Sequence, residues 1–192
     1  MGRRYSSDRF WSIMGMLWLA LVLLTCVELS PAPLSQEESA IQEAMQEFEA
    51  IERERVDSIT ALMGRWGFNR EVSTAIWDAA LAHGYEPDFT ASLVAIESAG
   101  DSTAVSQAGA VGLIQVIPRT AKVLGRDPRR LTEARYNLDT GLTYLRDMQE
   151  RFGSLGLALK AYNAGPTWAA WHAARGYKTE DMWYPRTVLE AM

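Results

Sequence analysis

The segment covering residues 88–100 restricts the fold more than any other part of this sequence. Its apolar residues recur at the spacing of a helix with one buried face: Phe89, Leu93, Val94 and Ile96. Glu97 lies four residues after Leu93, on or beside that face, and the residues 99–102 predict that the helix ends just after it. Burial and the partial negative charge of a helix end both disfavour an ionised carboxylate, so we expect a raised pKa for Glu97. Such a group can serve as a general acid, although many glutamates at helix ends are simply solvated.

Helix signals continue along the chain on both sides of this segment. We expect helices from an N-cap at Asn69 to residues 83–84, from Pro118 to Gly125, over residues 138–152 and over residues 155–162. Residues 108–116 are rich in glycine and β-branched residues and too short for a helix, which predicts a small β-hairpin or an extended loop. The predicted fold is therefore mainly α, with this loop beside a cleft.

Four sequence blocks follow one another in the same region. They are residues 97–121, with Glu97-Ser98 and Gly109-Ala-Val-Gly112-Leu-Ile-Gln115, then residues 136–145, 158–166 and 180–188. In this order they resemble the lytic transglycosylases, the SLT domain family with a goose-type lysozyme-like fold, over roughly residues 69–190. Two residues of the last block depart from the family pattern: Asp181 stands where threonine is expected, and Pro185 where valine or a similar residue is expected.

The resemblance implies an enzyme that cuts peptidoglycan glycan strands with a single carboxylate. In this family one glutamate, here Glu97, first protonates the glycosidic oxygen between N-acetylmuramic acid (MurNAc) and N-acetylglucosamine (GlcNAc). It then deprotonates the C6 hydroxyl of MurNAc, which attacks C1 and leaves a 1,6-anhydro end. Glycoside hydrolases usually need a second carboxylate, and the nearby Asp101 belongs to a predicted surface turn. Neither a cofactor nor a metal is expected.

The resemblance also assigns substrate contacts, to Ser106, Gly112, Gln115, Tyr162, Asn163 and Tyr184. Ser106 would hydrogen-bond near the acid and orient it, and Tyr162 would lie against Glu97. Gly112, with Gly109, would let the backbone approach the sugar, and Gln115 would bind an N-acetyl group. Asn163 would bind glycan or brace the loop. The alternative is structural: glycines also serve turns, and Tyr162 and Asn163 could cap a helix.

Other aromatic and charged residues favour structural interpretations. For the three tryptophans Trp168, Trp171 and Trp183, buried packing is favoured over stacking on sugars. The arginine cluster formed by Arg126, Arg129, Arg130 and Arg135 is interpreted as a solvated face, with contact to the carboxylates of a peptide-bearing glycan as the alternative. The two histidines, His83 and His172, are each isolated and are taken as structural. A formal net charge of −5 argues against a general nucleic-acid binder.

The N-terminal residues predict export and attachment to a membrane. Three arginines, Arg3, Arg4 and Arg9, precede residues 10–27, which carry no charge. This places the following domain outside the cytoplasm, at the periplasmic face of a bacterial membrane. Cys26, the only cysteine, ends a segment similar to a lipoprotein processing box, with Thr25 as a departure. Lipidation of Cys26 and an uncleaved anchor both remain open, and a cleaved soluble form is less favoured.

These observations predict three parts and three possible functions. Residues 1–34 form a signal or anchor with a linker, residues 35–66 an amphipathic helix, and residues 67–192 the catalytic domain. The helix is interpreted as a stalk or packing helix, with partner binding as the alternative. The lytic transglycosylase is the leading function. The alternatives are a goose-type muramidase that hydrolyses the same bond and a non-catalytic peptidoglycan-binding scaffold, which would serve an envelope machinery whose partner is unknown.

Overall fold

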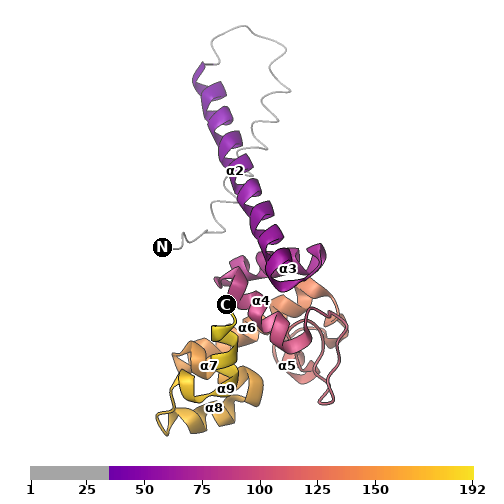
Figure 1. Ribbon diagram of the computed structural model, residues 1–192, viewed down its shortest axis with the longest axis vertical. Helices are drawn as coiled ribbons and strands as arrows, with labels where there is room; N and C mark the ends of the chain where they lie inside the picture. The colour runs from indigo at the N-terminus through magenta and orange to yellow at the C-terminus, as the bar shows by residue number, and fades with distance from the viewer. Residues whose placement is uncertain (1–34) are drawn as a thin grey trace. The chain divides into compact units, whose positions relative to one another are not determined.

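The computed structural model describes residues 35–192, which form helices joined by loops, the longest of them over residues 99–117 (Figure 1). The α-helices are α2 (Ser35–Trp66), α3 (Arg70–His83), α4 (Pro87–Ser98), α5 (Pro118–Val123), α6 (Ala134–Phe152), α7 (Leu155–Ala164), α8 (Pro166–Ala173) and α9 (Trp183–Glu190). Two 3-10 turns, η2 (Pro128–Arg130) and η3 (Thr179–Asp181), complete the described elements. The mainly α fold expected from the sequence is confirmed.

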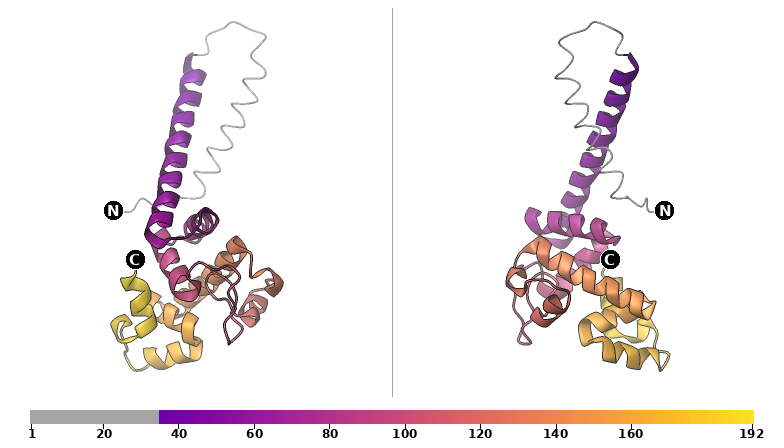
Figure 2. Two further views of the ribbon diagram at one scale, coloured as in Figure 1. Left: turned by 45° about the vertical axis from the view of Figure 1, so that its right-hand side comes forward. Right: turned by 180° about the vertical axis from the view of Figure 1, so that it is seen from behind.

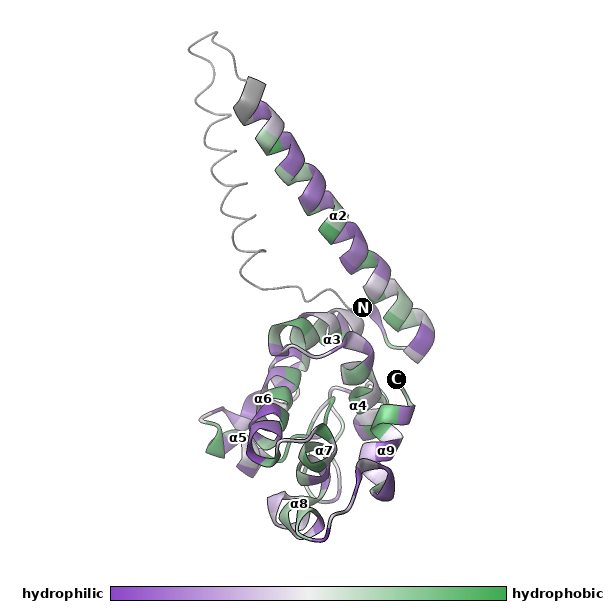
Figure 3. Ribbon diagram, turned by 90° about the vertical axis from the view of Figure 1, so that its left-hand side faces the viewer, coloured by the Kyte–Doolittle hydropathy of each residue, from purple (hydrophilic) through white to green (hydrophobic). Residues whose placement is uncertain are grey.

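The chain divides into two compact units, and the boundary between Ser58 and Ile59 falls inside α2. In the first unit this helix is largely exposed, and polar and apolar residues alternate along it (Figure 3). Its last turns belong to the second unit, where Ile59 and Leu62 are buried. None of the described helices is both long and apolar enough to cross a membrane. The segment 10–27 and Cys26 lie outside the described residues.

The second unit is built around α7 and the long helix α6. Helix α7 packs against α6, α8 and α9, and α3 packs against both α4 and α6 (Figure 3). Seen from behind, α6 runs from the loop-rich part of the unit toward α7, α8 and α9 (Figure 2). The fully buried leucines come from several of these elements: Leu93, Leu113, Leu131, Leu138, Leu142, Leu145 and Leu159. One continuous core therefore joins α4, α6, α7 and α9, and α9, near the end of the chain, packs against α4.

The helix boundaries follow local chemistry, and the sequence predicted most of them. The side chain of Asn69 accepts a hydrogen bond from the N–H of Val72 at 2.9 Å, and α3 ends at Gly84 with φ 74°. Helix α6 begins four residues earlier than expected, because its first turn is polar and interrupts the apolar spacing. Helix α5 ends at Val123, and α8 and α9 were not predicted.

The loop covering residues 104–117 contains isolated antiparallel bridges in place of a hairpin. Val111 bridges to both Val105 and Val116, and no strand forms within the described residues. The extended loop was therefore the correct one of the two predicted forms.

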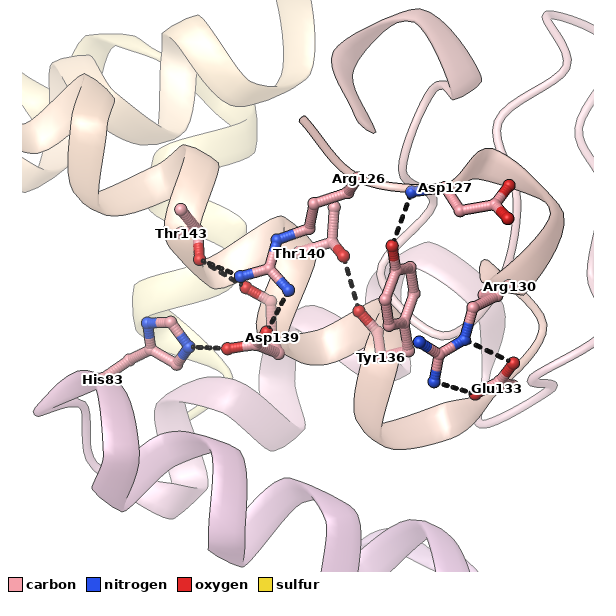
Figure 4. A network of polar contacts seen from close by, with 9 residues as sticks. All are labelled: His83, Arg126, Asp127, Arg130, Glu133, Tyr136, Asp139, Thr140 and Thr143. Carbon is pink, nitrogen blue, oxygen red and sulfur yellow. Dashed lines mark hydrogen bonds and ion pairs between the residues drawn. The ribbon is translucent and has the colours of Figure 1, made fainter. Parts of the chain in front are cut away.

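A polar network fastens the turn before α6 onto that helix (Figure 4). Asp139 accepts a hydrogen bond from Nε2 of His83 at 2.7 Å and pairs with Arg126. The hydroxyl of Tyr136 accepts a hydrogen bond from the N–H of Asp127 at 2.6 Å. His83 is therefore structural, as predicted.

The arginine cluster is largely exposed, as predicted, and each of its members also pairs with a carboxylate of the same chain. These ion pairs are Arg126–Asp139, Arg129–Asp127 at 2.8 Å, Arg130–Glu133 at 2.7 Å and Arg135–Asp78 at 2.8 Å. Arg130 also lies over the ring of Tyr136 at 4.2 Å. The positive charges in this region are thus already matched within the protein, which argues against the alternative of binding a peptide-bearing glycan here.

Candidate active site

Glu97 lies in the last turn of α4 and is half-buried, as its position in the sequence predicted. The helix ends at Ala99, which adopts the left-handed conformation with φ 53°. The side chain of Glu97 contributes to the wall of a cavity of about 940 Å³. Burial raises its pKa above the ordinary value, and a hydrogen bond from Tyr184 opposes part of that rise. The predicted direction of the pKa shift is confirmed.

Tyr184 holds the carboxylate of Glu97 from the side away from the cavity. Its side chain is 1% exposed and is not part of the cavity wall, and its hydroxyl donates a hydrogen bond to Oε1 of Glu97 at 2.5 Å. Burial raises the pKa of Tyr184 far above its ordinary value, so the hydroxyl stays protonated and remains a donor. The structure therefore makes Tyr184 a positioning residue, where the sequence had predicted a substrate contact.

The two departures from the family pattern in the last block fit this arrangement. Asp181 accepts a hydrogen bond from the N–H of Lys178 at 2.9 Å and closes the turn before α9. Pro185 is the third residue of α9, within the first turn, where a backbone N–H has no partner inside the helix. Neither residue prevents Tyr184 from reaching Glu97.

Asn137 fixes the loop opposite Glu97 from inside the core. It is fully buried on α6, its side-chain oxygen accepts from the N–H of Ile114 at 2.9 Å, and its amide donates to the carbonyls of Val111 and Leu131 at 2.8 Å each. A Cβ on Gly112 would lie 2.3 Å from the amide nitrogen of Asn137. Gly112 is therefore required for close packing against Asn137, where the sequence analysis assigned it to sugar binding.

Ser98 and Tyr162 hold the same loop from two other helices. The hydroxyl of Ser98 donates to the carbonyl of Leu113 at 2.8 Å, and that of Tyr162 donates to the carbonyl of Ile114 at 2.6 Å. Tyr162 also lines the cavity, and burial followed by the nearby charge of Glu97 raises its pKa far above the ordinary value. The expected proximity of Tyr162 and Glu97 is present, and the hydroxyl serves the loop and does not cap a helix.

The three remaining residues predicted to contact the substrate, Ser106, Gln115 and Asn163, line the cavity. Ser106 accepts a hydrogen bond from the N–H of Ala110 at 3.0 Å, an interaction within the loop rather than with Glu97. The amide of Gln115 donates to the carbonyls of Ala104 at 3.2 Å and Gly112 at 3.0 Å, which leaves its oxygen as the group for a ligand. Asn163 is exposed on the same wall.

Glu97 is the sole carboxylate among the described residues that line the cavity. Asp101 is exposed in the turn after α4, as predicted, and accepts hydrogen bonds from the N–H and the hydroxyl of Thr103 at 2.8 and 2.7 Å. These bonds lower its pKa. The two neighbouring carboxyl groups therefore have pKa values shifted in opposite directions, and only one of them faces the cavity.

Comparison with known proteins identifies the domain that carries this cavity. Residues 74–183 match the model of the transglycosylase SLT domain family. The chain belongs to this family. The resemblance seen in the four sequence blocks is thereby confirmed.

Three known proteins are each similar to part of the chain. The chain is 34% identical over 116 residues to the transglycosylase of enterobacteria phage PRD1, covering 58% of this chain and 39% of that protein. It is 37% identical over 92 residues to the soluble lytic murein transglycosylase of Salmonella typhimurium, with coverages of 41% and 14%. It is 36% identical over 85 residues to a membrane-bound lytic murein transglycosylase C of Actinobacillus pleuropneumoniae, with coverages of 38% and 22%.

A solved structure is similar in fold, that of an inactive mutant of the lytic transglycosylase Slt from Pseudomonas aeruginosa. The TM-score is 0.50 at 25% identity, and the match covers 61% of this chain and 22% of that one. The chain thus spans less than two fifths of the length of each of these relatives. The lysozyme-like helical fold expected for an SLT domain is consistent with this neighbour.

The three tryptophans for which buried packing was predicted are exposed, so that prediction was wrong. Trp168 is 54% exposed, Trp171 38% and Trp183 60%. Helix α8 is short and buries only Ala169, so its two tryptophans pack on each other with ring centroids 5.8 Å apart. Apolar character predicts burial only where a helix has a second element to cover it.

Several residues of the site were missed in the sequence. Asn137 shares one face of α6 with the buried Gly141 and Leu145, and a polar residue on an apolar helix face was the signal available for it. Arg119 and Arg151 also line the cavity, and no local pattern marked either of them. Within the described residues no cluster of side chains could hold a metal ion.

Proposed function

We propose that the chain is a peptidoglycan lytic transglycosylase that cleaves the β-1,4 bond between MurNAc and GlcNAc and leaves a 1,6-anhydro-MurNAc end. The observation that carries the proposal is a single half-buried carboxyl group with a raised pKa on the wall of a large cavity. The names of the relatives, lytic murein transglycosylases among them, support this reaction class. The solved relative is a Glu-to-Gln mutant described as inactive, which supports a glutamate in the reaction.

In the proposed mechanism Glu97 acts twice. Its protonated form donates the proton to the glycosidic oxygen while the bond from C1 to that oxygen breaks. The resulting carboxylate then takes the proton of the C6 hydroxyl as that oxygen bonds to C1, so no water is consumed and Glu97 is protonated again. Tyr184 engages Oε1, which leaves Oε2 for the proton transfers. A raised pKa keeps the acid protonated at a higher pH than an exposed glutamate would be.

The cavity favours this reaction over hydrolysis by a muramidase. Hydrolases of glycosides place two carboxyl groups about 5 to 9.5 Å apart on opposite sides of the scissile bond. Among the described residues the cavity wall offers Glu97 alone, and Asp101 is bound to Thr103 outside it. A non-catalytic scaffold would not need a half-buried acid with a raised pKa beside an open cavity.

Turnover of purified sacculi by the wild type and Glu97→Gln tests the proposed role of the acid. We expect the substitution to lower the rate of release of soluble fragments by about 10³-fold, since the amide cannot donate or accept the proton, while binding to sacculi persists. Asp101→Asn is the matched control and is expected to change the rate less than about twofold. Equal rates for Glu97→Gln and the wild type would remove Glu97 from the mechanism. A wild type that binds sacculi without cutting them would favour the scaffold.

We also propose that the domain acts at the periplasmic face of a bacterial membrane, attached through its N-terminal segment. The uncharged residues 10–27 after three arginines support export, and Cys26 offers a site for a lipid. Intact-mass measurement of protein extracted from membranes separates the two forms of attachment. A mass increased by a diacylglyceryl group on a chain that begins at Cys26 indicates a lipoprotein, and the mass of the whole chain indicates an uncleaved anchor.

A further inference from the structure

Two arginines on the wall of the cavity have no carboxylate partner. Arg119 comes from α5 and Arg151 from the last turn of α6, and both are exposed. Neither forms an ion pair with another described residue, although acidic residues outnumber basic ones in the whole chain, 24 to 19. In the arginine cluster, by contrast, every guanidinium is matched by a carboxylate of the same chain.

Local structure does not account for the charge of Arg119. It is the second residue of α5, where the partial positive charge of the helix start disfavours a cation. Arg151 lies at the opposite kind of helix end, which favours a cation, and its guanidinium lies 5.3 Å from the centroid of the Phe152 ring. The feature that the two side chains share is their position on the cavity wall.

The charges on the cavity wall are therefore unbalanced when the reaction begins. Glu97 has to be protonated, and so uncharged, to act as the acid. The described wall then carries two guanidinium groups and no negative charge. Such a wall favours an anionic ligand, and guanidinium binds carboxylate through paired charge-assisted hydrogen bonds. On a glycan strand whose MurNAc lactyl groups carry peptides through amide bonds, the free carboxylates belong to the peptide stems.

We propose that Arg119 and Arg151 bind carboxylates of these peptide stems, so that the cavity selects strands whose stems carry free carboxylates. The inference rests on the proposed function for the identity of the strand. Because both guanidinium groups are exposed, the selectivity is modest and weakens as salt screens it.

The test compares glycan strands whose peptide stems carry free carboxylates with the same strands after these carboxylates have been converted to amides. Removal of the peptides by an amidase would not serve, because it exposes the lactyl carboxylate of each MurNAc. We expect the wild type to favour the strands with free stem carboxylates by about tenfold in kcat/KM, and Arg119→Ala combined with Arg151→Ala to bring the ratio to within about twofold of one. Replacement of both by lysine keeps the charge and should retain part of the selectivity. The matched control is Arg53→Ala with Arg70→Ala, which removes two exposed arginines outside the cavity and should leave the ratio unchanged.

Binding by Glu97→Gln protein separates a failure of this inference from a failure of the proposed function. If the wild type cuts neither strand, the proposed reaction is wrong, and equilibrium binding of the two strands still measures the selectivity. A preference for strands with free stem carboxylates that disappears with the two alanine substitutions, and shrinks as salt rises, supports the assignment. A wild type without this preference overturns the assignment. A double alanine variant that keeps the preference overturns it as well.

Discussion

The buried interior next to Glu97 and the cavity wall differ in how many of their polar groups are hydrogen-bonded within the protein. In the protein interior, Tyr184 holds the acid and Asn137 holds the facing loop, and the side-chain hydrogen bonds of both are made to other parts of the protein. On the cavity side, Arg119, Arg151 and Asn163 are exposed on the wall. The buried side fixes the acid and the loop facing it, and the open side is left for the ligand. Substitutions on the buried side should therefore change stability or the pKa of the acid, and those on the open side should change binding.

The largest effect is expected for Asn137→Ala on the buried side. The substitution removes three hydrogen bonds and leaves the N–H of Ile114 without its partner inside the core. We expect the free energy of unfolding to fall by about 3 kcal/mol, together with most of the activity, because the loop opposite Glu97 loses its anchor. Urea unfolding followed by circular dichroism measures the loss. A decrease below about 1 kcal/mol would show that Asn137 does not hold the loop.

Gly112→Ala should be nearly as damaging, and Gly109→Ala provides the matched control. Both glycines have a left-handed backbone, with φ 82° and φ 78°. A Cβ on Gly112 would lie 2.3 Å from the amide of Asn137 and 2.4 Å from the carbonyl of Leu131, whereas one on Gly109 meets no atom within 4 Å.

We expect a loss of stability of about 2 to 4 kcal/mol for Gly112→Ala, from strain and overlap together, and of about 1 kcal/mol for Gly109→Ala from strain alone. Thermal and urea unfolding of the two variants give the comparison. Equal losses would show that close packing against Asn137 contributes nothing.

Tyr184→Phe should act on the acid more than on the fold. The phenyl ring keeps the packing but no longer donates to Oε1, and that hydrogen bond lowers the pKa of Glu97. The pKa of Glu97 should therefore rise further. Because the mechanism begins with the protonated acid, the fall of activity with rising pH should move to higher pH.

We expect the maximal rate of Tyr184→Phe to decrease by about tenfold as the acid loses its fixed position. The pH dependence of kcat/KM on soluble strands measures both effects. Tyr177→Phe, on an exposed tyrosine outside the cavity wall, is the control and should leave the profile in place. A shift of the Tyr184→Phe profile to lower pH would contradict the assigned role.

The smallest effect is expected for Asn163→Ala on the open side. The side chain is exposed on the cavity wall, so its removal should leave the free energy of unfolding within about 0.5 kcal/mol of the wild type. We expect KM for glycan strands to rise by about threefold with little change in kcat, consistent with the loss of one hydrogen bond to a ligand. A large loss of stability would place Asn163 with the buried side.

Much of this arrangement could be predicted from the sequence where the causes are local. The position and pKa direction of Glu97 follow from its place at the end of an apolar helix, and the cap at Asn69 follows from its own side chain. The carboxyl group of Asp101 was correctly placed in a surface turn for the same reason.

The rest depends on contacts between distant parts of the chain. Tyr184 reaches Glu97 across 87 positions, and only the resemblance to a known family pointed to it. The role of Gly112 depends on Asn137, which no spacing rule connects to it. The tryptophans of α8 were mispredicted because burial depends on a covering element. The pairing of Arg126 with Asp139 and of Arg135 with Asp78 could not be predicted, because the fold brings these partners together.

The source of the oxygen at the new MurNAc end tests the proposed single-carboxylate reaction most directly. Purified sacculi are digested by the wild type in water enriched in oxygen-18, and the released muropeptides are analysed by mass spectrometry. We predict products that end in 1,6-anhydro-MurNAc, lighter than the corresponding reducing-end products by one water and free of oxygen-18. Reducing ends that carry one oxygen-18 would show attack by water and would contradict the proposed role of Glu97 as the sole acid and base.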